Sequence, residues 1–208
     1  MEAAETVASL VNDIAQEVLG SVLRSASLHL SNKCKNNILI NPQVYTSSGY
    51  SYDPPQPTVG KGVTEVCAFG QTKGTARGSV GVLTYDIAID RKTRAVHRLA
   101  IMFSVPFDHN LYENWFALGL FDTSQVCDES LFDLMYYKEG SFMRAKASGS
   151  EMSFQAGQYI LRGTMCPVAN AEVKVELWDH EVPRLRSTHS WLSTVAKRYF
   201  KCVHSASA

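Results

Sequence analysis

The sequence predicts a mainly β protein: a β-sandwich flanked by two α-helices. Short runs rich in β-branched and aromatic residues, separated by Gly, Pro, Asn and Ser, fill most of residues 27–181. An apolar stripe of helical period occupies residues 1–26, and a second helical pattern lies near 125–137. The chain has 208 residues, enough to bury one substantial core.

The first predicted element is an amphipathic helix within residues 1–26. Its apolar stripe consists of Val7, Leu10, Val11, Ile14, Val18 and Val22. Such a stripe usually packs on the chain's own domain, but a helix over residues 3–25 would also span about 34 Å, enough for a bilayer core. Glu5, Asp13 and Glu17 would each cost about 2.5–3.5 kcal/mol at the bilayer centre. A single helix should therefore not cross, whereas several helices lining shared water could.

Strands are expected through the middle of the chain, in residues 27–42, 63–70, 79–90, 97–106, 115–122, 148–165 and 171–180. Residues 45–62 are predicted to form a turn-rich loop, because Pro54 and Pro55 exclude a central strand. In the second helix, Asp122 and Gln125 have the spacing of a capping box. Leu131, Leu134 and Met135 can face a core, while Phe132, Tyr136 and Tyr137 form another stripe.

The last segment, residues 182–208, is predicted to be a basic tail that is partly helical. From Pro183 onward it has five basic residues and no acidic ones, so the rest of the chain carries fifteen basic and twenty acidic residues. A net charge of zero argues against a dedicated nucleic-acid binder, and the tail suits an acidic surface. The opening residues lack the pattern of a secretory signal, so the soluble form is expected to be cytosolic, or secreted with a signal that was already removed or never needed.

Motifs of catalysis and metal binding are missing from the sequence. The five cysteines have no CxxC spacing, and the six histidines show no HxH or HExxH pattern. Neither GxSxG nor a phosphate-binding P-loop occurs. We therefore expect no catalytic residue, metal or cofactor, and we expect that the protein is not an enzyme. A lipase is a third interpretation, for which no nucleophile motif is visible.

The segment SVPFDHNLYENWF, residues 104–116, is rich in aromatic rings and follows the pattern of neither a buried strand nor a helix. Rings near a proline commonly form a small core beneath a loop. The alternative is an exposed surface in contact with a membrane interface, where Tyr and Trp place an apolar body beside a polar tip.

Ordered blocks of the chain resemble the actinoporins, small pore-forming cytolysins of sea anemones, and their relatives in vertebrates and molluscs. GSVGVLTY (78–85) is similar to the family's strand before its lipid-binding loop, MFSVPFDHNLYENWF (102–116) to its aromatic loop, and LFDLMYY (131–137) to its tyrosine-bearing helix. With the opening helix, the blocks span roughly residues 3–181. The family's fold, a β-sandwich with two flanking helices, agrees with the fold class predicted from the residues.

The resemblance implies a phosphocholine-binding site made of Ser48, Val80, Ser104, Pro106, Tyr112, Phe132, Tyr136 and Tyr137. Phe132 stands where the family has a tyrosine, so we expect altered headgroup choice. The resemblance also implies a membrane-interface loop presenting Leu111, Trp115 and Phe116, where the family usually has three tryptophans. A methylated ammonium cannot donate a hydrogen bond and is held by aromatic faces, while its phosphate needs hydroxyl donors.

The sequence thus predicts a membrane-binding, pore-forming cytolysin whose partners are choline phospholipids, sphingomyelin and copies of itself. It would anchor through the aromatic loop, form an oligomer in the target membrane and insert the N-terminal helix. The rival interpretation is a non-lytic lipid- or glycan-binding, lectin-like module on the same sandwich. Two features favour the rival: two of the loop tryptophans are replaced, and no secretion signal is visible.

Overall fold

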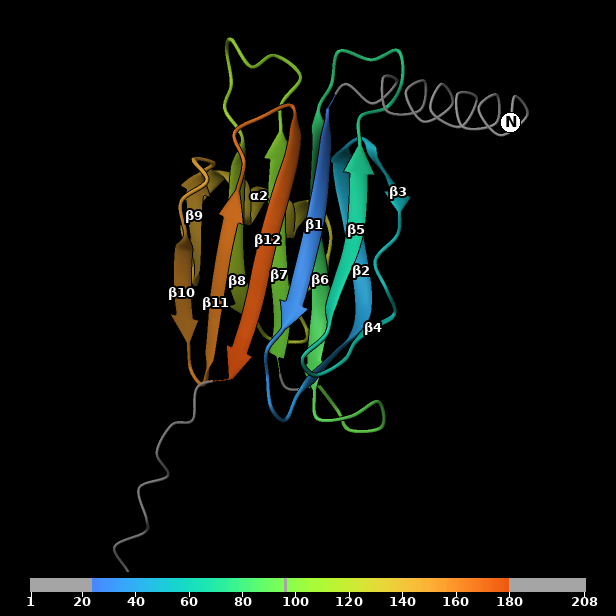
Figure 1. The fold of residues 1–208 in the computed structure, drawn as a ribbon, viewed down its shortest axis with the longest axis vertical. Coiled ribbons are helices and arrows are strands. Elements are labelled where there is room, and N and C mark those ends of the chain that lie inside the picture. Colours follow the sequence, from blue (N-terminus) through green and yellow to red (C-terminus); the bar gives the residue numbers. More distant parts are fainter. Residues whose placement is uncertain (1–23, 96, 180–208) are drawn as a thin grey trace, which may run out of the picture.

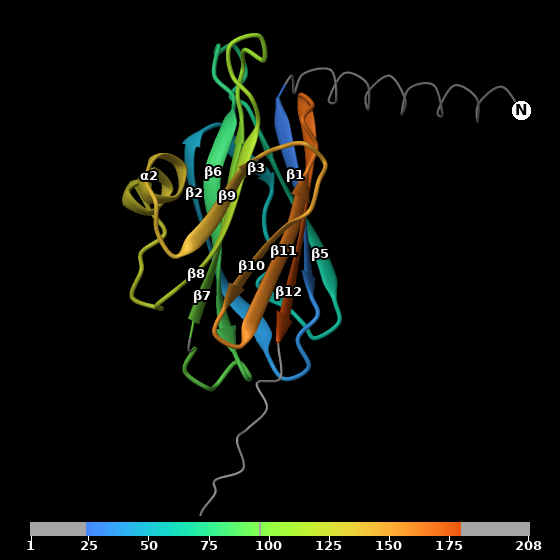
Figure 2. The ribbon, with the colours of Figure 1, turned by 90° about the vertical axis from the view of Figure 1, so that its left-hand side faces the viewer.

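The computed structural model describes residues 24–95 and 97–179, and its architecture is a sandwich of two six-stranded sheets with one helix in this part of the chain. Figures 1 and 2 show the two sheets as stacked layers. The fold class predicted from the sequence is confirmed. The predicted N-terminal helix (1–26) falls almost wholly, and the predicted basic tail (182–208) entirely, outside the described residues.

The first sheet has the strand order β10-β11-β12-β1-β5-β3 (Figure 1). Its strands are β1 (Ser25–Asn32), β3 (Tyr50–Asp53), β5 (Thr64–Gly70), β10 (Met152–Ala156), β11 (Tyr159–Met165) and β12 (Asn170–Asp179). β1 and β12 pair in parallel and the other neighbours are antiparallel. The earliest and latest described strands therefore lie side by side.

The second sheet has the order β4-β2-β6-β7-β8-β9 and is antiparallel throughout. Its strands are β2 (Ile38–Ser48), β4 (Thr58–Val59), β6 (Ser79–Ala88), β7 (His97–Val105), β8 (Trp115–Phe121) and β9 (Phe142–Lys146). Residues 45–62 are not a loop throughout, as predicted, because β2 runs into this segment and β3 and β4 lie within it. Pro54 and Pro55 fall between two edge strands, where no central ladder needs their missing N–H groups.

The main core lies between the two sheets and follows from strand alternation. Successive side chains of a strand point to opposite faces, so every second residue of a central strand points toward the other sheet. In these strands those residues are apolar. Leu83, Ile101, Phe103, Phe116 and Leu118 supply the second sheet's share of this core, and Leu28, Phe69, Leu161, Val173 and Val175 supply part of the first sheet's share. These side chains are almost completely buried.

The helix α2 (Glu129–Tyr137) covers part of the outer face of the second sheet (Figure 2). A second apolar cluster joins them: Leu131, Phe132 and Met135 of the helix pack on Val82, Ala100, Met102 and Ala117. The predicted start near 125 and the capping box at Asp122 were wrong. Asp128 is the N-cap and accepts a hydrogen bond from the Leu131 N–H at 3.0 Å, while residues 122–125 form a separate turn.

Candidate functional site

A row of paired residues crosses the outer face of the second sheet just beyond the helix. Ser48 of β2 pairs with Val80, Val80 with Ser104, Ser104 with Trp115, and Trp115 with Lys146 of β9. The next row on this face, two residues along each strand, contains Val82, Met102 and Ala117, which the helix covers. Because side chains alternate along a strand, the first row lies on the same face of the sheet as the helix. The helix packs on the second row and does not cover the first.

The last turns of α2 bring three aromatic rings to this row. Phe132 and Tyr136 are four residues apart and stack with ring centroids 5.4 Å apart, and Tyr137 meets Tyr136 edge to face at 4.7 Å. Phe132 is 4% exposed and also packs against Tyr45, whereas Tyr137 is 69% exposed. The cluster therefore has a buried base and an open end.

The environment of Tyr45 disfavours the ionised form of its phenol beside this cluster. Burial raises the pKa of Tyr45, and the carboxylates of Glu129, Asp133 and Asp128 raise it further. A neutral ring at the base adds no negative charge to the aromatic wall.

The segment between β7 and β8, residues 106–114, closes the other side of the site. Asp108 organises its turn, because its side chain accepts from the Asn110 N–H and its carbonyl from the Tyr112 N–H. Arg24 donates from Nε to the carbonyls of Pro106 and Phe107, at 3.1 and 2.8 Å, and its guanidinium lies 5.5 Å from the centroid of the Phe107 ring. The loop is thus tied to the residue that directly precedes β1.

The other end of this loop is fixed to the first sheet. The Asn114 side chain donates to the carbonyls of Cys166 and Val168, at 3.0 and 2.9 Å, and Asn114 is 3% exposed. Between these two attachments Leu111 and Tyr112 project outward, 73% and 61% exposed. An apolar leucine and a ring are therefore held at the surface by a braced backbone.

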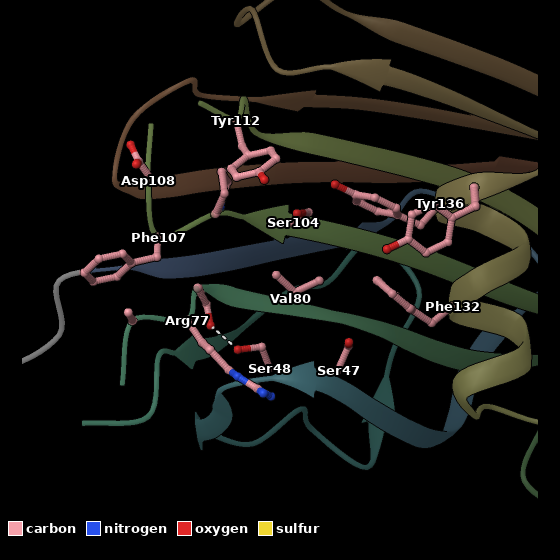
Figure 3. A pocket seen from close by; sticks show the side chains of 14 residues that line it. Ser47, Ser48, Arg77, Val80, Ser104, Phe107, Asp108, Tyr112, Phe132 and Tyr136 are labelled. Carbon is pink, nitrogen blue, oxygen red and sulfur yellow. Dashed lines mark hydrogen bonds between the residues drawn. The ribbon is translucent and has the colours of Figure 1, made fainter. Parts of the chain in front are cut away.

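Between the helix, the row and the loop lies an open cavity of about 350 Å³ (Figure 3). Its lining includes all eight residues that the resemblance implied for phosphocholine: Ser48, Val80, Ser104, Pro106, Tyr112, Phe132, Tyr136 and Tyr137. They come from β2, β6, β7, the 106–114 loop and α2. The structure brings them together in one place, and the volume is in the usual range for a small-ligand site.

Six further residues line the cavity and were not among the predicted site residues: Ser47, Ala76, Arg77, Gly78, Phe107 and Asp108. Gly78 is required by close packing, because a Cβ there would lie 2.0 Å from the Val105 carbonyl oxygen. Gly49 has φ +91° and a similar approach to Gly70. Only Phe107 carried a visible signal, since it belongs to the ring-rich segment.

The three residues predicted for the membrane interface have different positions. Leu111 is at the surface, and Trp115 is half-buried, with the Arg144 guanidinium and Lys146 ammonium 5.9 and 5.7 Å from its ring centroid. Phe116 was wrongly assigned: it is 1% exposed and packs in the core between the sheets. Strand β8 begins at Trp115, so its next residue must point to the opposite face.

Within the described ranges, no helix has the length and apolarity needed to cross a membrane. The same part of the chain contains no cluster of three or more His, Cys, Asp or Glu side chains suited to hold a metal ion. The cavity is lined by aromatic faces, hydroxyl groups, one positively charged side chain (Arg77) and one negatively charged side chain (Asp108). This combination suits a small ligand that carries both a positive and a negative charge.

Comparisons with known proteins identify relatives of the chain. A profile of the family described as sea anemone cytotoxic protein matches residues 2–178. Bryoporin of Physcomitrium patens is 35% identical over 103 residues, covering 50% of this chain and 55% of its own. DELTA-actitoxin-Aas1a of Anthopleura asiatica is 31% identical over 144 residues, 68% of this chain and 63% of its own. These findings confirm the resemblance to actinoporins, while the matches span little more than half the length of these two relatives.

A solved structure supports the fold independently. The lipid-binding protein Nakanori superposes with a TM-score of 0.60 at 11% sequence identity, covering 83% of this chain and 79% of its own. At that identity the likeness concerns the sandwich architecture alone.

Proposed function

The chain belongs to the sea anemone cytotoxic protein family, and from this premise we propose that it is a membrane-binding, pore-forming cytolysin that captures choline phospholipid headgroups, sphingomyelin among them, in the cavity beside α2. One observation carries the proposal: the eight residues implied by the family resemblance, distant in sequence, line a single open cavity.

Capture of the methylated ammonium depends on the rings of α2. Tyr136 and Tyr137 meet edge to face, so together they offer a concave aromatic corner, with Phe132 stacked behind. Each ring face attracts a cation by about 0.5–2 kcal/mol, more when water is excluded. Phe132 is buried, so its missing hydroxyl removes a donor from the base of the cavity and leaves the exposed phenols of Tyr112 and Tyr137 unchanged.

Attachment to the bilayer would use the surface beside the cavity. Leu111, Tyr112 and Tyr137 are the exposed apolar or aromatic side chains there, and the half-buried Trp115 is paired with Ser104 of the cavity lining. A leucine can enter the acyl boundary, while tyrosine and tryptophan suit the headgroup level. Exposure of these groups to water is unfavourable in the free protein but favourable at a lipid interface.

The later steps are proposed from the family resemblance. Oligomerisation on the membrane would gather several copies of the amphipathic helix in residues 1–26, so that the polar faces share water and the stripe from Val7 to Val22 faces lipid. Acidic residues on those polar faces would favour cations. The same chain would thus exist in a soluble form and in a form bound to the target membrane.

The test is dye leakage and vesicle binding, measured with and without sphingomyelin in phosphatidylcholine vesicles. We expect the wild-type chain to bind and to release dye, and Tyr112→Ala combined with Tyr137→Ala to weaken binding at least tenfold, because two ring contacts are lost. Ile89→Ala is the matched control, since Ile89 is 59% exposed and lies just past the end of β6, away from the cavity.

Two results would contradict the proposal. Full binding by the double variant would reject the cavity as the headgroup site. Tight vesicle binding by the wild-type chain without any dye release would reject pore formation.

A further inference from the structure

Arg77 stands at the wall of the cavity that faces away from the α2 rings, and Figure 3 shows it beside Ser48. It directly precedes Gly78, whose backbone is packed against Val105 and Pro106 too closely to admit a Cβ. The start of the side chain is therefore fixed, although Arg77 itself is exposed. Among the described residues, none forms a hydrogen bond or ion pair with its guanidinium.

The hydroxyl groups near Arg77 differ in whether their proton is free to form a hydrogen bond with an anion. Ser48 donates its hydroxyl proton to the Gly78 carbonyl at 2.8 Å, and a hydroxyl has only one proton to give. Ser104 is 3% exposed and lines the cavity, and its hydroxyl has no hydrogen-bond partner in the described part of the chain. Ser47 adds a further hydroxyl to the lining, but apart from Arg77 the side chains of the lining offer an anion only uncharged donors. Without Arg77 the cavity would therefore lack a charged donor for a phosphate.

The guanidinium supplies this charged donor. It carries five N–H donors in a planar arrangement that matches phosphate oxygens, and it adds a full positive charge. Asp108, the acidic side chain of the lining, belongs to the opposite loop, and one of its carboxylate oxygens accepts a hydrogen bond from the Asn110 N–H. A phosphate would be repelled from the Asp108 side and attracted to the Arg77 side.

We propose that Arg77 is a specificity-determining residue of this cavity: it binds the phosphate of a phosphocholine group and so selects phosphate-bearing choline compounds over choline itself. The ligand would lie with its ammonium against Tyr136 and Tyr137 and its phosphate between Ser104 and Arg77. This inference rests on the proposed function, because it assumes that the cavity is the headgroup site. The phosphocholine can belong to a membrane lipid or to a free phosphocholine molecule.

The test is titration calorimetry of the full chain with soluble phosphocholine and with choline. We expect Arg77→Gln to weaken phosphocholine binding roughly tenfold, the effect of losing charge-assisted hydrogen bonds. Choline binding should stay unchanged or become tighter, because the guanidinium repels an ammonium. Arg77→Lys keeps the charge without the planar donor pair, so its affinity for phosphocholine should lie between the other two.

The control is Lys73→Gln, which removes the same charge from the same loop at an exposed residue that does not line the cavity. Its affinity for phosphocholine should equal that of the wild type. If Arg77→Gln binds phosphocholine as tightly as the wild type does, the role of Arg77 is rejected and the proposed function stands. If the wild type binds neither compound, the proposed function fails and this inference fails with it.

Vesicles of phosphatidylcholine distinguish the two sources of the ligand. If Arg77→Gln weakens binding to vesicles and binding to soluble phosphocholine by the same factor, the phosphate belongs to a lipid headgroup. Weakening confined to the soluble compound would assign it to free phosphocholine. Both results support the pairing of Arg77 with phosphate, whereas equal weakening by Lys73→Gln would reduce the effect to general charge and overturn it.

Discussion

The two faces of the sheet containing β6, β7 and β8 use similar side chains for opposite purposes. On the inner face, Phe103 and Phe116 are buried against the other sheet and contribute to stability. On the outer face, the α2 rings line a cavity that remains open to solvent, and Trp115 lies half-buried in the row of paired residues that crosses this face. Trp115 and Phe116 are neighbours in sequence, so the pleat of one strand decides which ring is structural and which is available to a ligand or a bilayer.

The largest expected effect comes from emptying the inner face. Phe116→Ala should lower the free energy of unfolding by about 3–5 kcal/mol, because it removes a fully buried ring and leaves a void. Urea denaturation followed by circular dichroism measures this loss. Trp115→Ala, the reciprocal change on the outer face, should cost less than about 1 kcal/mol. Equal losses in the two variants would contradict the assignment of faces.

The close packing at the cavity wall gives the next effect. Gly78→Ala places a Cβ 2.0 Å from the Val105 carbonyl oxygen, so we expect a loss of about 1–3 kcal/mol and reduced phosphocholine affinity. Gly60→Ala is the control, since the nearest atom there is the end of the Val63 side chain at 3.3 Å. Denaturation midpoints and calorimetry report both quantities. A Gly78→Ala protein with unchanged stability would show that β6 and β7 are less closely apposed than described.

A smaller effect should separate the faces by function. Trp115→Ala should weaken vesicle binding roughly fivefold, the equivalent of losing about 1 kcal/mol of interfacial contact. Phe116→Leu, which keeps an apolar core side chain, should fold and bind vesicles like the wild type. Co-sedimentation with phosphatidylcholine vesicles measures both. If Phe116→Leu loses vesicle binding and Trp115→Ala keeps it, the assignment of membrane contact to the outer face is contradicted.

The last effect appears only at high pH and concerns two thiols that face the core. Burial, with a smaller contribution from a nearby carboxylate (Asp179 for Cys34 and Asp53 for Cys67), raises the pKa of each thiol from 9.0 to about 12. A thiol held neutral stabilises the fold fully below pH 9, and this contribution is lost as the pH rises from about 9 towards 12. The free energy of unfolding of Cys67→Ala should therefore fall less steeply over that range than the wild-type value. Parallel pH profiles would contradict the burial of this thiol.

Much of the architecture was readable from the sequence because strand runs and turn residues alternate clearly along it. Residues 79–90 and 97–106 predicted β6 and β7, and the predicted second stripe of the helix, Phe132, Tyr136 and Tyr137, is the side of α2 that lines the cavity. β9 was missed because Phe142–Lys146 is short and contains two charged residues. β3 and β4 were missed because edge strands tolerate the adjacent prolines that exclude a central strand.

The site was less accessible to prediction. Ser48, Val80 and Ser104 were named only through the family resemblance, since nothing in their spacing places them in one row; that depends on strand pairing across the sheet. Arg77 gave no signal, because an arginine before a glycine usually belongs to a solvated turn. The error at Phe116 was avoidable: in WFALGLF the alternation groups Phe116 with Leu118, and separates both from Trp115.

The most direct measurement is a crystal structure of the full chain with phosphocholine. The account predicts the ligand in the cavity beside α2, with its methyl groups against Tyr136 and Tyr137 and its phosphate facing Ser104 and Arg77. Phosphocholine bound elsewhere on the sandwich, or a cavity that stays empty at concentrations where calorimetry shows binding, would contradict it.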